Sequence, residues 1–359
     1  MSVNVPLSQA DARRIDRLRN RKGRRKPAKV PARLTRTGAF APKRRGLITD
    51  AGFKRLYVVP RHSVIQVTGR ELGSQHRDAL YALFRLPHDR VVVTDPKSPI
   101  GRIALNVTHT TWRDLIIALG LTQHINNVAN LVLTFEELMQ VTMTVYEGPQ
   151  ERIVPELERG RVPDTPLQGK HLIHEFSAEG TRLDSRVCVT YGQWVTDNMA
   201  RMKLVSLNAD VQFALKSDYA KSFWPYIDGL PRHSWVDEKV LAALVGRDLW
   251  AEDETSATRR DFRANCRKAF DDMVRAGGLE GWREEVTGHG RVKGRKYHWT
   301  AATLPGAAET LPDSAEAAPS GSISHESGEA PIAAHGDGGR AASRCGAKRE
   351  GRPQFEMAL

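Results

Sequence analysis

The stretch from Thr258 to Ala276 constrains the fold more than any other part of the chain. Apolar side chains recur there at every fourth position, namely at Phe262, Cys266, Phe270 and Val274. This is the spacing of a single buried face of an α-helix. The glycine pair 277–278 that follows is a typical helix stop. The sequence therefore predicts a long amphipathic helix that packs on a small core.

The elements around this helix have a recognisable order. We expect a short strand at 205–207, an aromatic-rich helix at 219–227 that Pro225 kinks or ends, and a short helix at 236–245. After the long helix come two strands, 282–286 and 296–300, joined by a glycine-rich turn. Helices followed by a β-ribbon in this order indicate a winged-helix domain.

The first half of the chain repeats the order. We expect a helix at 77–86, a strand at 103–107, a helix capped by Thr110 or Thr111 and ended by Gly120, and a helix at 124–139. Strands at 141–146, 170–176 and 186–191 follow, with the proline-rich segment 148–169 as a long wing loop. The predicted fold class is α+β, with two tandem winged-helix domains at 53–203 and 204–301.

The two ends of the chain differ from this body. Residues 1–48 lack hydrophobic periodicity, and residues 302–359 are rich in Ala, Gly, Ser, Pro and Glu, so we expect both to be disordered tails. Fifteen lysines and arginines against two aspartates lie in 1–48, which accounts for the chain's net charge of +12. This basic arm can bind polyanions by counterion release or can simply be a solvated tail.

Basic side chains mark the second unit as a candidate DNA reader. The long helix and the turn after it carry nine candidate contacts: Arg259, Arg260, Arg263, Arg267, Lys268, Arg291, Lys293, Arg295 and Lys296. In a helix-turn-helix the second helix enters the major groove, where the arginine fork suits guanine. Either cluster alone is more simply a solvated face. Both together, on the two elements of a winged helix that reach DNA, favour double-stranded DNA as the partner.

The equivalent helix of the first unit is uncharged where the second is basic. Its exposed positions include Asn126, Asn127 and Asn130. Asparagine can read adenine, but these side chains can equally face water or a partner subunit. Contact of this unit with DNA therefore stays open.

Three segments resemble the iteron-binding plasmid replication initiators of the TrfA-like and RepA-like kind: Arg186–Tyr191, Lys216–Tyr226 and Arg263–Leu279. The resemblance implies binding to repeated sites at a plasmid origin, melting of A·T-rich DNA, plasmid copy control and recruitment of the host initiator and helicase. It also implies a monomer–dimer equilibrium with the first winged helix at the interface. By position, Arg260, Arg263 and Arg267 match the recognition-helix face of such initiators.

The C-terminal segment resembles the peptide with which bacterial proteins bind the sliding clamp. Its candidate anchors are Gln354, Phe355, Met357 and Leu359. A terminal peptide on a flexible linker can insert spaced apolar side chains into a groove. Chance is the simpler explanation of so short a pattern.

Signatures of other protein classes are missing from the sequence. There is no P-loop, no CxxC pair and no long apolar run, so we expect no catalytic or metal site, no cofactor, no membrane partner and a cytoplasmic location. His171 and His174 point to opposite faces if they lie on a strand, which disfavours a nicking or relaxase-type enzyme. A transcriptional regulator that uses the same winged helix is the main alternative.

Overall fold

The computed structural model describes residues 27–59, 63–94, 101–201, 203–230, 234–249, 251, 255–288 and 294–302. All of them belong to one compact unit of the chain. No helix among them is long and apolar enough to cross a membrane.

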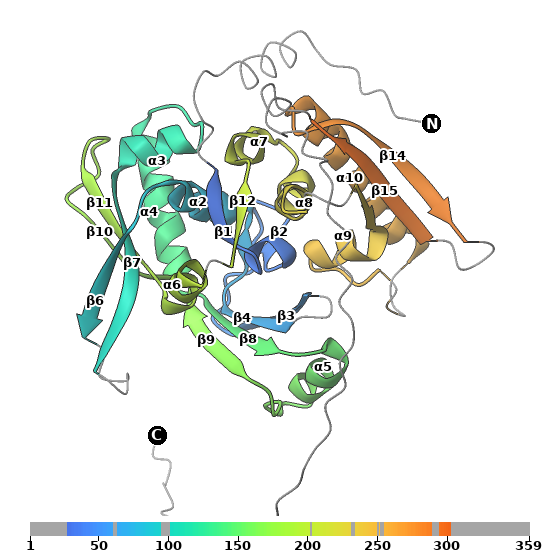
Figure 1. The fold of residues 1–359 in the computed structure, drawn as a ribbon, viewed down its shortest axis with the longest axis horizontal. Helices are drawn as coiled ribbons and strands as arrows, with labels where there is room; N and C mark the ends of the chain where they lie inside the picture. The colour runs from blue at the N-terminus through green and yellow to red at the C-terminus, as the bar shows by residue number, and fades with distance from the viewer. Residues whose placement is uncertain are drawn as a thin grey trace, which may run out of the picture. The chain divides into compact units, whose positions relative to one another are not determined.

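The second winged helix has the predicted order of elements. Its helices and strands are α8 (Asp218–Asp228), β13 (Trp235–Asp237), α9 (Glu238–Leu244), α10 (Ser256–Arg275), β14 (Leu279–Thr287) and β15 (Gly294–Ala301). The strands form an antiparallel sheet in the order β13-β15-β14, and β14 and β15 run along α10 (Figure 1). Pro225 lies inside α8 and does not end it.

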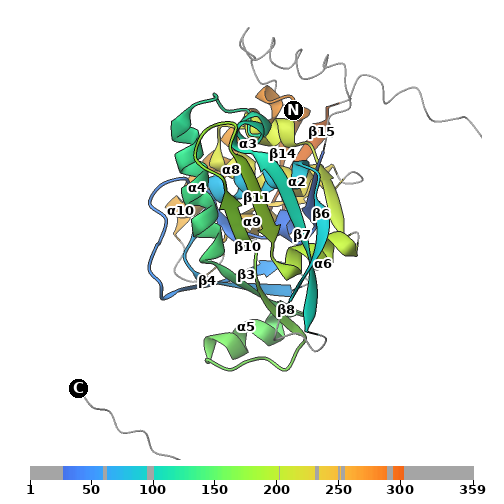
Figure 2. The same ribbon diagram turned by 90° about the vertical axis from the view of Figure 1, so that its left-hand side faces the viewer.

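The first winged helix follows the same plan. Its elements are α2 (Ser74–Arg85), β6 (Asp89–Thr94), β7 (Arg102–Thr111), α3 (Trp112–Ala118), α4 (Ile125–Met139), β10 (Ile173–Ala178) and β11 (Arg186–Tyr191). The sheet order is β10-β11-β7-β6, so the strand before the helix pair again lies beside the last strand (Figure 2). Thr111 caps α3, and Gly120 follows it with φ +69°. The prediction of two tandem winged helices is confirmed.

The predicted position of the wing in the first winged helix is wrong. The strand predicted at 141–146 is β8 (Thr142–Glu147), which joins a separate sheet with β3 (Phe53–Val59), β4 (Ser63–Gly69) and β9 (Leu167–His171) in the order β3-β4-β8-β9. The segment 148–169 is an insertion that holds helix α5 (Gln150–Glu158), in spite of Pro155. Ile153 and Leu157 of α5 bury themselves against Val64 and Tyr146, which stabilises the helix. The true wing is the turn 179–185 between β10 and β11.

Part of the segment expected to be a disordered arm is structured. Residues 28–31 form strand β1, which pairs antiparallel with β12 (Leu204–Leu207), and the helical turn η1 (Leu34–Arg36) and strand β2 (Phe40–Ala41) follow. β2 pairs in parallel with β5 (Leu72–Gly73). Ala28, Val30, Leu34 and Phe40 are buried. Lysines and arginines lie between these buried apolar residues, so the sequence shows no hydrophobic periodicity here. Pro31 is tolerated because it lies at the end of a two-stranded ribbon.

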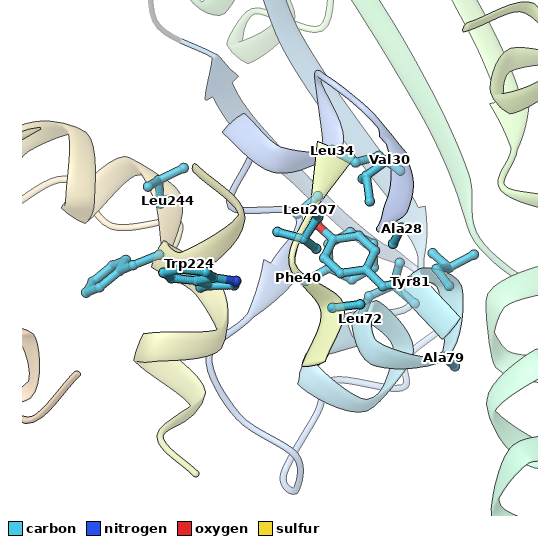
Figure 3. Close-up of a cluster of buried hydrophobic side chains, with 14 of the residues drawn as sticks. Ala28, Val30, Leu34, Phe40, Leu72, Ala79, Tyr81, Leu207, Trp224 and Leu244 are labelled. Atoms are coloured by element: carbon cyan, nitrogen blue, oxygen red, sulfur yellow. The ribbon is translucent and has the colours of Figure 1, made fainter. Parts of the chain in front are cut away.

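One hydrophobic core includes side chains from the N-terminal segment and both winged helices. Figure 3 shows members of this cluster from β1, α2, β12 and α8, among them Val30, Tyr81, Leu207 and Trp224. Two helices that were not predicted, α6 (Gln193–Ala200) and α7 (Ala209–Ala214), connect the units around β12. The apolar side chains of this core make the two winged helices parts of one folded body.

Candidate nucleic-acid interface

Helix α10 is held on one side by the core and open on the other. Its N-cap, Thr255, accepts a hydrogen bond at Oγ1 from the backbone N–H of Thr258 at 3.2 Å. On the buried side, the ring of Phe270 stacks on Tyr297 of β15 with centroids 5.3 Å apart. The helix ends where Gly277 takes φ +76°. The outward face of α10 is therefore fixed in direction by the packing of its inner face.

The outward face of α10 carries three exposed cations. Arg260 has 81% of its side chain exposed, and its ion pair with the neighbouring Asp261 is a loose one at 3.7 Å. Arg267 and Lys268, two turns further along, are also exposed. Together they form a basic face that begins near the N-terminus of the helix.

Arg263 is engaged inside the protein. Its Nε and Nη2 donate to the two carboxylate oxygens of Glu238 at 2.6 and 3.1 Å. Glu238 is the first residue of α9, and only 2% of its side chain is exposed. The hydrogen bond to Glu238 raises the pKa of Arg263 above its ordinary value. This bidentate pair ties α10 to α9 and so fixes the angle of the helix-turn-helix.

A second carboxylate holds two of the predicted contacts. Glu284 of β14 accepts from Nε of Arg267 at 2.9 Å and from Nη1 of Arg295, which lies on β15. Burial, followed by the nearby charge of Arg263, lowers the pKa of Arg295. The arginines 263, 267 and 295 thus gather with two glutamates where α10 meets the base of the wing.

The remaining predicted residues of this unit are placed as follows. Lys296 lies over the ring of Trp235, with Nζ 4.4 Å from the ring centroid, at the edge of the sheet formed by β13 and β15. Arg259 is half-buried in the first turns of α10. Arg291 and Lys293 lie outside the described residues, as do the candidate clamp anchors 354–359.

Helix α4 of the first unit presents a different surface. Asn126 and Asn130 are exposed, whereas Asn127 donates from Nδ2 to the carbonyl oxygen of Thr122 at 2.7 Å. Ile125 and Leu133 are exposed on the same helix, at 49% and 56%. α4 contains no lysine or arginine. Its surface is partly apolar and carries the exposed Glu136, unlike the basic face of α10.

The described residues contain no group of three or more His, Cys, Asp or Glu side chains able to hold a metal ion. His171 bonds through Nδ1 to the carbonyl oxygen of Val141 at 3.0 Å, which gives this ring a structural contact.

Two carboxylates that matter to the site were not predicted from the sequence. Glu238 and Glu284 are separated from the arginines they bind by 25 and 17 residues. The available signal was a weak one: Glu238 opens an apolar helix that should hide it, so its burial requires a cationic partner.

No protein-family description and no curated protein matches this chain. Several solved structures align with it. A selenomethionine structure of domains 2 and 3 of RctB aligns with 76% of this chain and 99% of its own, at 11% identity and a TM-score of 0.47. A second structure of RctB domains 2–3 aligns with 75% and 96%, at 10% identity and a TM-score of 0.42. The Pi initiator protein in complex with iteron DNA aligns with 54% and 81%, at 11% identity and a TM-score of 0.37.

Proposed function

We propose that this protein is a replication initiator that binds repeated sites in duplex origin DNA through its second winged helix. The observation that carries the proposal is the basic face of α10, formed by Arg260, Arg267 and Lys268 on the outer helix of a helix-turn-helix. The rest of the body is close to neutral, so this face is a local concentration of charge rather than a general bias.

The spacing along α10 suits a major groove. Arg260 and Arg267 are seven residues apart, about 10 Å along the helix axis. Successive base pairs are about 3.4 Å apart, so the two side chains span about three base pairs. Arginine reads guanine bidentately, and Lys268 beside them can contact a phosphate. Arg259, Arg291, Lys293, Arg295 and Lys296 are proposed to support this contact through the start of the helix and the wing.

The first winged helix has a separate role in this proposal. Its helix α4 has exposed apolar residues, an exposed Glu136 and no cation, which suits contact between protein chains better than contact with phosphate. Dimerisation through this unit and recruitment of the host initiator and helicase are proposals that follow the sequence resemblance. Clamp binding, from the C-terminal peptide, and a cytoplasmic location are further proposals. Asn126, Asn127 and Asn130 are proposed as base contacts only if this unit also binds DNA.

The experiment is selection from a random duplex library followed by footprinting. The full-length chain is incubated with duplexes that contain a random segment, and the bound fraction is sequenced. An initiator is expected to enrich one motif, and that motif should recur as direct repeats beside A·T-rich DNA in the replicon that encodes the protein. Enrichment of a single palindrome at a promoter would instead identify a transcriptional regulator. Absence of any enriched motif contradicts the proposal, and strand cleavage with Mg²⁺ or Mn²⁺ would identify a nicking enzyme.

A further inference from the structure

We propose that Glu284 is a positioning residue that orients Arg267 for reading a base, and that it thereby sets the sequence discrimination of α10. This inference rests on the proposed binding of duplex DNA. It concerns a residue of the wing strand β14 whose own negative charge opposes DNA binding.

The contact between the two side chains is specific in its geometry. Glu284 Oε2 accepts from Nε of Arg267 at 2.9 Å, on the inner edge of the guanidinium. Arg267 keeps 48% of its side chain exposed, whereas Glu284 keeps 14%. Within the described residues, the two Nη atoms of Arg267 have no protein partner. The carboxylate therefore holds one edge of the fork and leaves the opposite edge available.

Arg263 shows the contrasting arrangement on the same helix. It gives both Nε and Nη2 to Glu238, and only 24% of its side chain is exposed. A bidentate contact with guanine needs two N–H donors on one edge of the guanidinium. Arg267 presents its edge of two Nη atoms on a side chain that is 48% exposed, whereas the side chain of Arg263 is 24% exposed and held at two atoms by a buried carboxylate. The geometry therefore assigns base reading to Arg267 and a structural role to Arg263.

Orientation by a carboxylate has an energetic reason. A long arginine side chain loses rotamer freedom when it binds, and this loss weakens the contact. Glu284 imposes part of the order before DNA arrives. Arg295 supplies a second positive partner to Glu284, so the three side chains together keep a net charge of about +1. The carboxylate can thus remain close to a phosphate backbone without an unbalanced negative charge.

The role predicts opposite effects on two measured quantities. Glu284→Gln removes a negative charge near the phosphates, so affinity for a non-specific duplex should rise. The neutral amide holds Arg267 less firmly, so discrimination between the selected duplex and a scrambled duplex should fall. A purely structural ion pair would lower thermal stability and leave the ratio of the two dissociation constants unchanged.

The test measures both dissociation constants for the full-length protein at one fixed salt concentration. The probes are the winning duplex of the random library and the same duplex scrambled. Glu284→Gln is expected to reduce the ratio by about tenfold, the scale of one good base contact. The matched control is Glu285→Gln, which removes the same charge one residue further along β14, where the carboxylate binds His298 Nε2 at 2.7 Å. This control should leave the ratio unchanged.

A conservative variant covers the case in which Glu284→Gln does not fold. Arg267→Lys keeps the charge but loses the fork, and should reduce the ratio as much as Glu284→Gln does. In the double variant the two losses should not add, because both remove the same interaction. If either Glu284→Gln or Arg267→Lys keeps the wild-type ratio of the two dissociation constants, the inference is overturned. If instead the wild-type protein shows no preference for any duplex, the proposed function itself has failed.

Discussion

Arg77 donates from Nη1 to the backbone carbonyl oxygen of Lys221 at 2.7 Å, and so joins helix α2 of the first winged helix to helix α8 of the second. Its Nη2 donates to the carbonyl oxygen of Phe40 at 2.9 Å, and its guanidinium lies 5.2 Å from the centroid of the Phe40 ring. Beside it, Asp78 forms an ion pair with Nζ of Lys221. Burial lowers the pKa of Arg77. The apolar core that joins the two winged helices thus also contains buried polar groups that are hydrogen-bonded across the joint.

Replacing Arg77 should destabilise the whole body. Arg77→Met removes a charged donor from two buried carbonyl oxygens, and that of Lys221 keeps only a long bond of 3.3 Å from Nε2 of Gln212. Each poorly satisfied buried group costs about 1–3 kcal/mol. We expect the free energy of unfolding in urea to fall by about 3 kcal/mol, with a single transition retained. Arg90→Met, at an exposed position of β6, should change it little. Two separate transitions in the wild-type protein would contradict a shared folding unit.

Truncations of the N-terminus should separate charge from structure. Residues 1–26 contain nine of the fifteen cations, and residues 28–41 contribute buried side chains. Deletion of 1–26 should leave the melting temperature unchanged. If the cations bind DNA, it should also flatten the plot of log K against log salt by about 0.9 for each phosphate that the arm neutralises in the full-length protein.

Deletion of 1–48 serves as the comparison for that truncation. It removes the strand β1 and the Phe40 ring and should abolish cooperative unfolding. If the longer truncation melts like the shorter one, the segment 27–48 is not part of the core.

Arg260 and Arg263 should give opposite phenotypes. Arg263→Ala leaves the buried carboxylate of Glu238 unpaired, which costs about 3–5 kcal/mol of stability. Arg260→Ala removes a side chain exposed at 81% and should change stability by less than about 0.5 kcal/mol. It should instead weaken specific binding by about 1–3 kcal/mol if Arg260 reads a base. Urea unfolding measures the loss of stability, and a duplex titration at fixed salt measures the loss of binding. If Arg260→Ala lost stability and Arg263→Ala lost only binding, the roles given to the two arginines would be reversed.

His76 should make stability depend on pH. Burial lowers its pKa below the ordinary value of 6.5, against the opposing effect of Glu137, which its Nε2 contacts at 2.6 Å. Its Nδ1 accepts from the backbone N–H of Gly73 at 2.9 Å, a bond that protonation would break. At pH values between the lowered pKa and 6.5, the unfolded chain binds more protons than the folded protein. The contribution of His76 to the free energy of unfolding is therefore fully present above pH 6.5 and declines as the pH falls below 6.5.

The measurement is the free energy of unfolding at several pH values between about 5 and 8, the range in which histidines titrate. His76→Asn keeps an acceptor near Gly73 and removes the titrating group, so it should flatten the decline. His109→Asn, at an exposed position, should not. An equal decline in wild type and His76→Asn would assign the pH dependence to another group.

The C-terminal peptide is testable without reference to the fold. Deletion of Gln354–Leu359 should abolish capture of the protein by immobilised bacterial sliding clamp and leave duplex binding unchanged. Replacing residues 346–351 with serine and glycine is a suitable control, because it alters the tail without touching the anchors. Undiminished capture by the truncated protein would show that the peptide is not a clamp ligand.

The predictable parts of this fold are those whose signal is local. The four-residue spacing of Phe262, Cys266 and Phe270 was enough to place α10, and Gly120 and Gly277 marked helix ends because each adopts a positive φ. Strand β1 was not predictable, since its partner β12 lies far along the chain and lysine and arginine interrupt its apolar residues. Helix α5 was missed for a similar reason: Pro155 argues locally against a helix, and packing on β4 and β8 decides for it.

In the candidate site, too, the features with a local sequence signal were predictable and those that depend on distant contacts were not. The basic face of α10 could be predicted from the spacing of Arg260 and Arg267, because residues seven apart share a side of a helix. The pairing of Arg263 with Glu238 depends on how α9 and α10 cross, which no local pattern contains. Sequence reasoning consequently treated all these arginines alike, whereas the structure separates the exposed Arg260 and Arg267 from Arg263, which the buried Glu238 binds at two atoms.

The ribbon of β1 and β12 also has a consequence for synthesis. Lys29 and Ser206, which are bonded across it, are 177 residues apart. A nascent chain therefore makes the first strand long before its partner leaves the ribosome, and closing so large a loop is slow. Until residue 207 has emerged, Ala28 and Val30 have no partner strand. The first winged helix can gain its local structure during translation, but its N-terminal strand is completed only when the second begins.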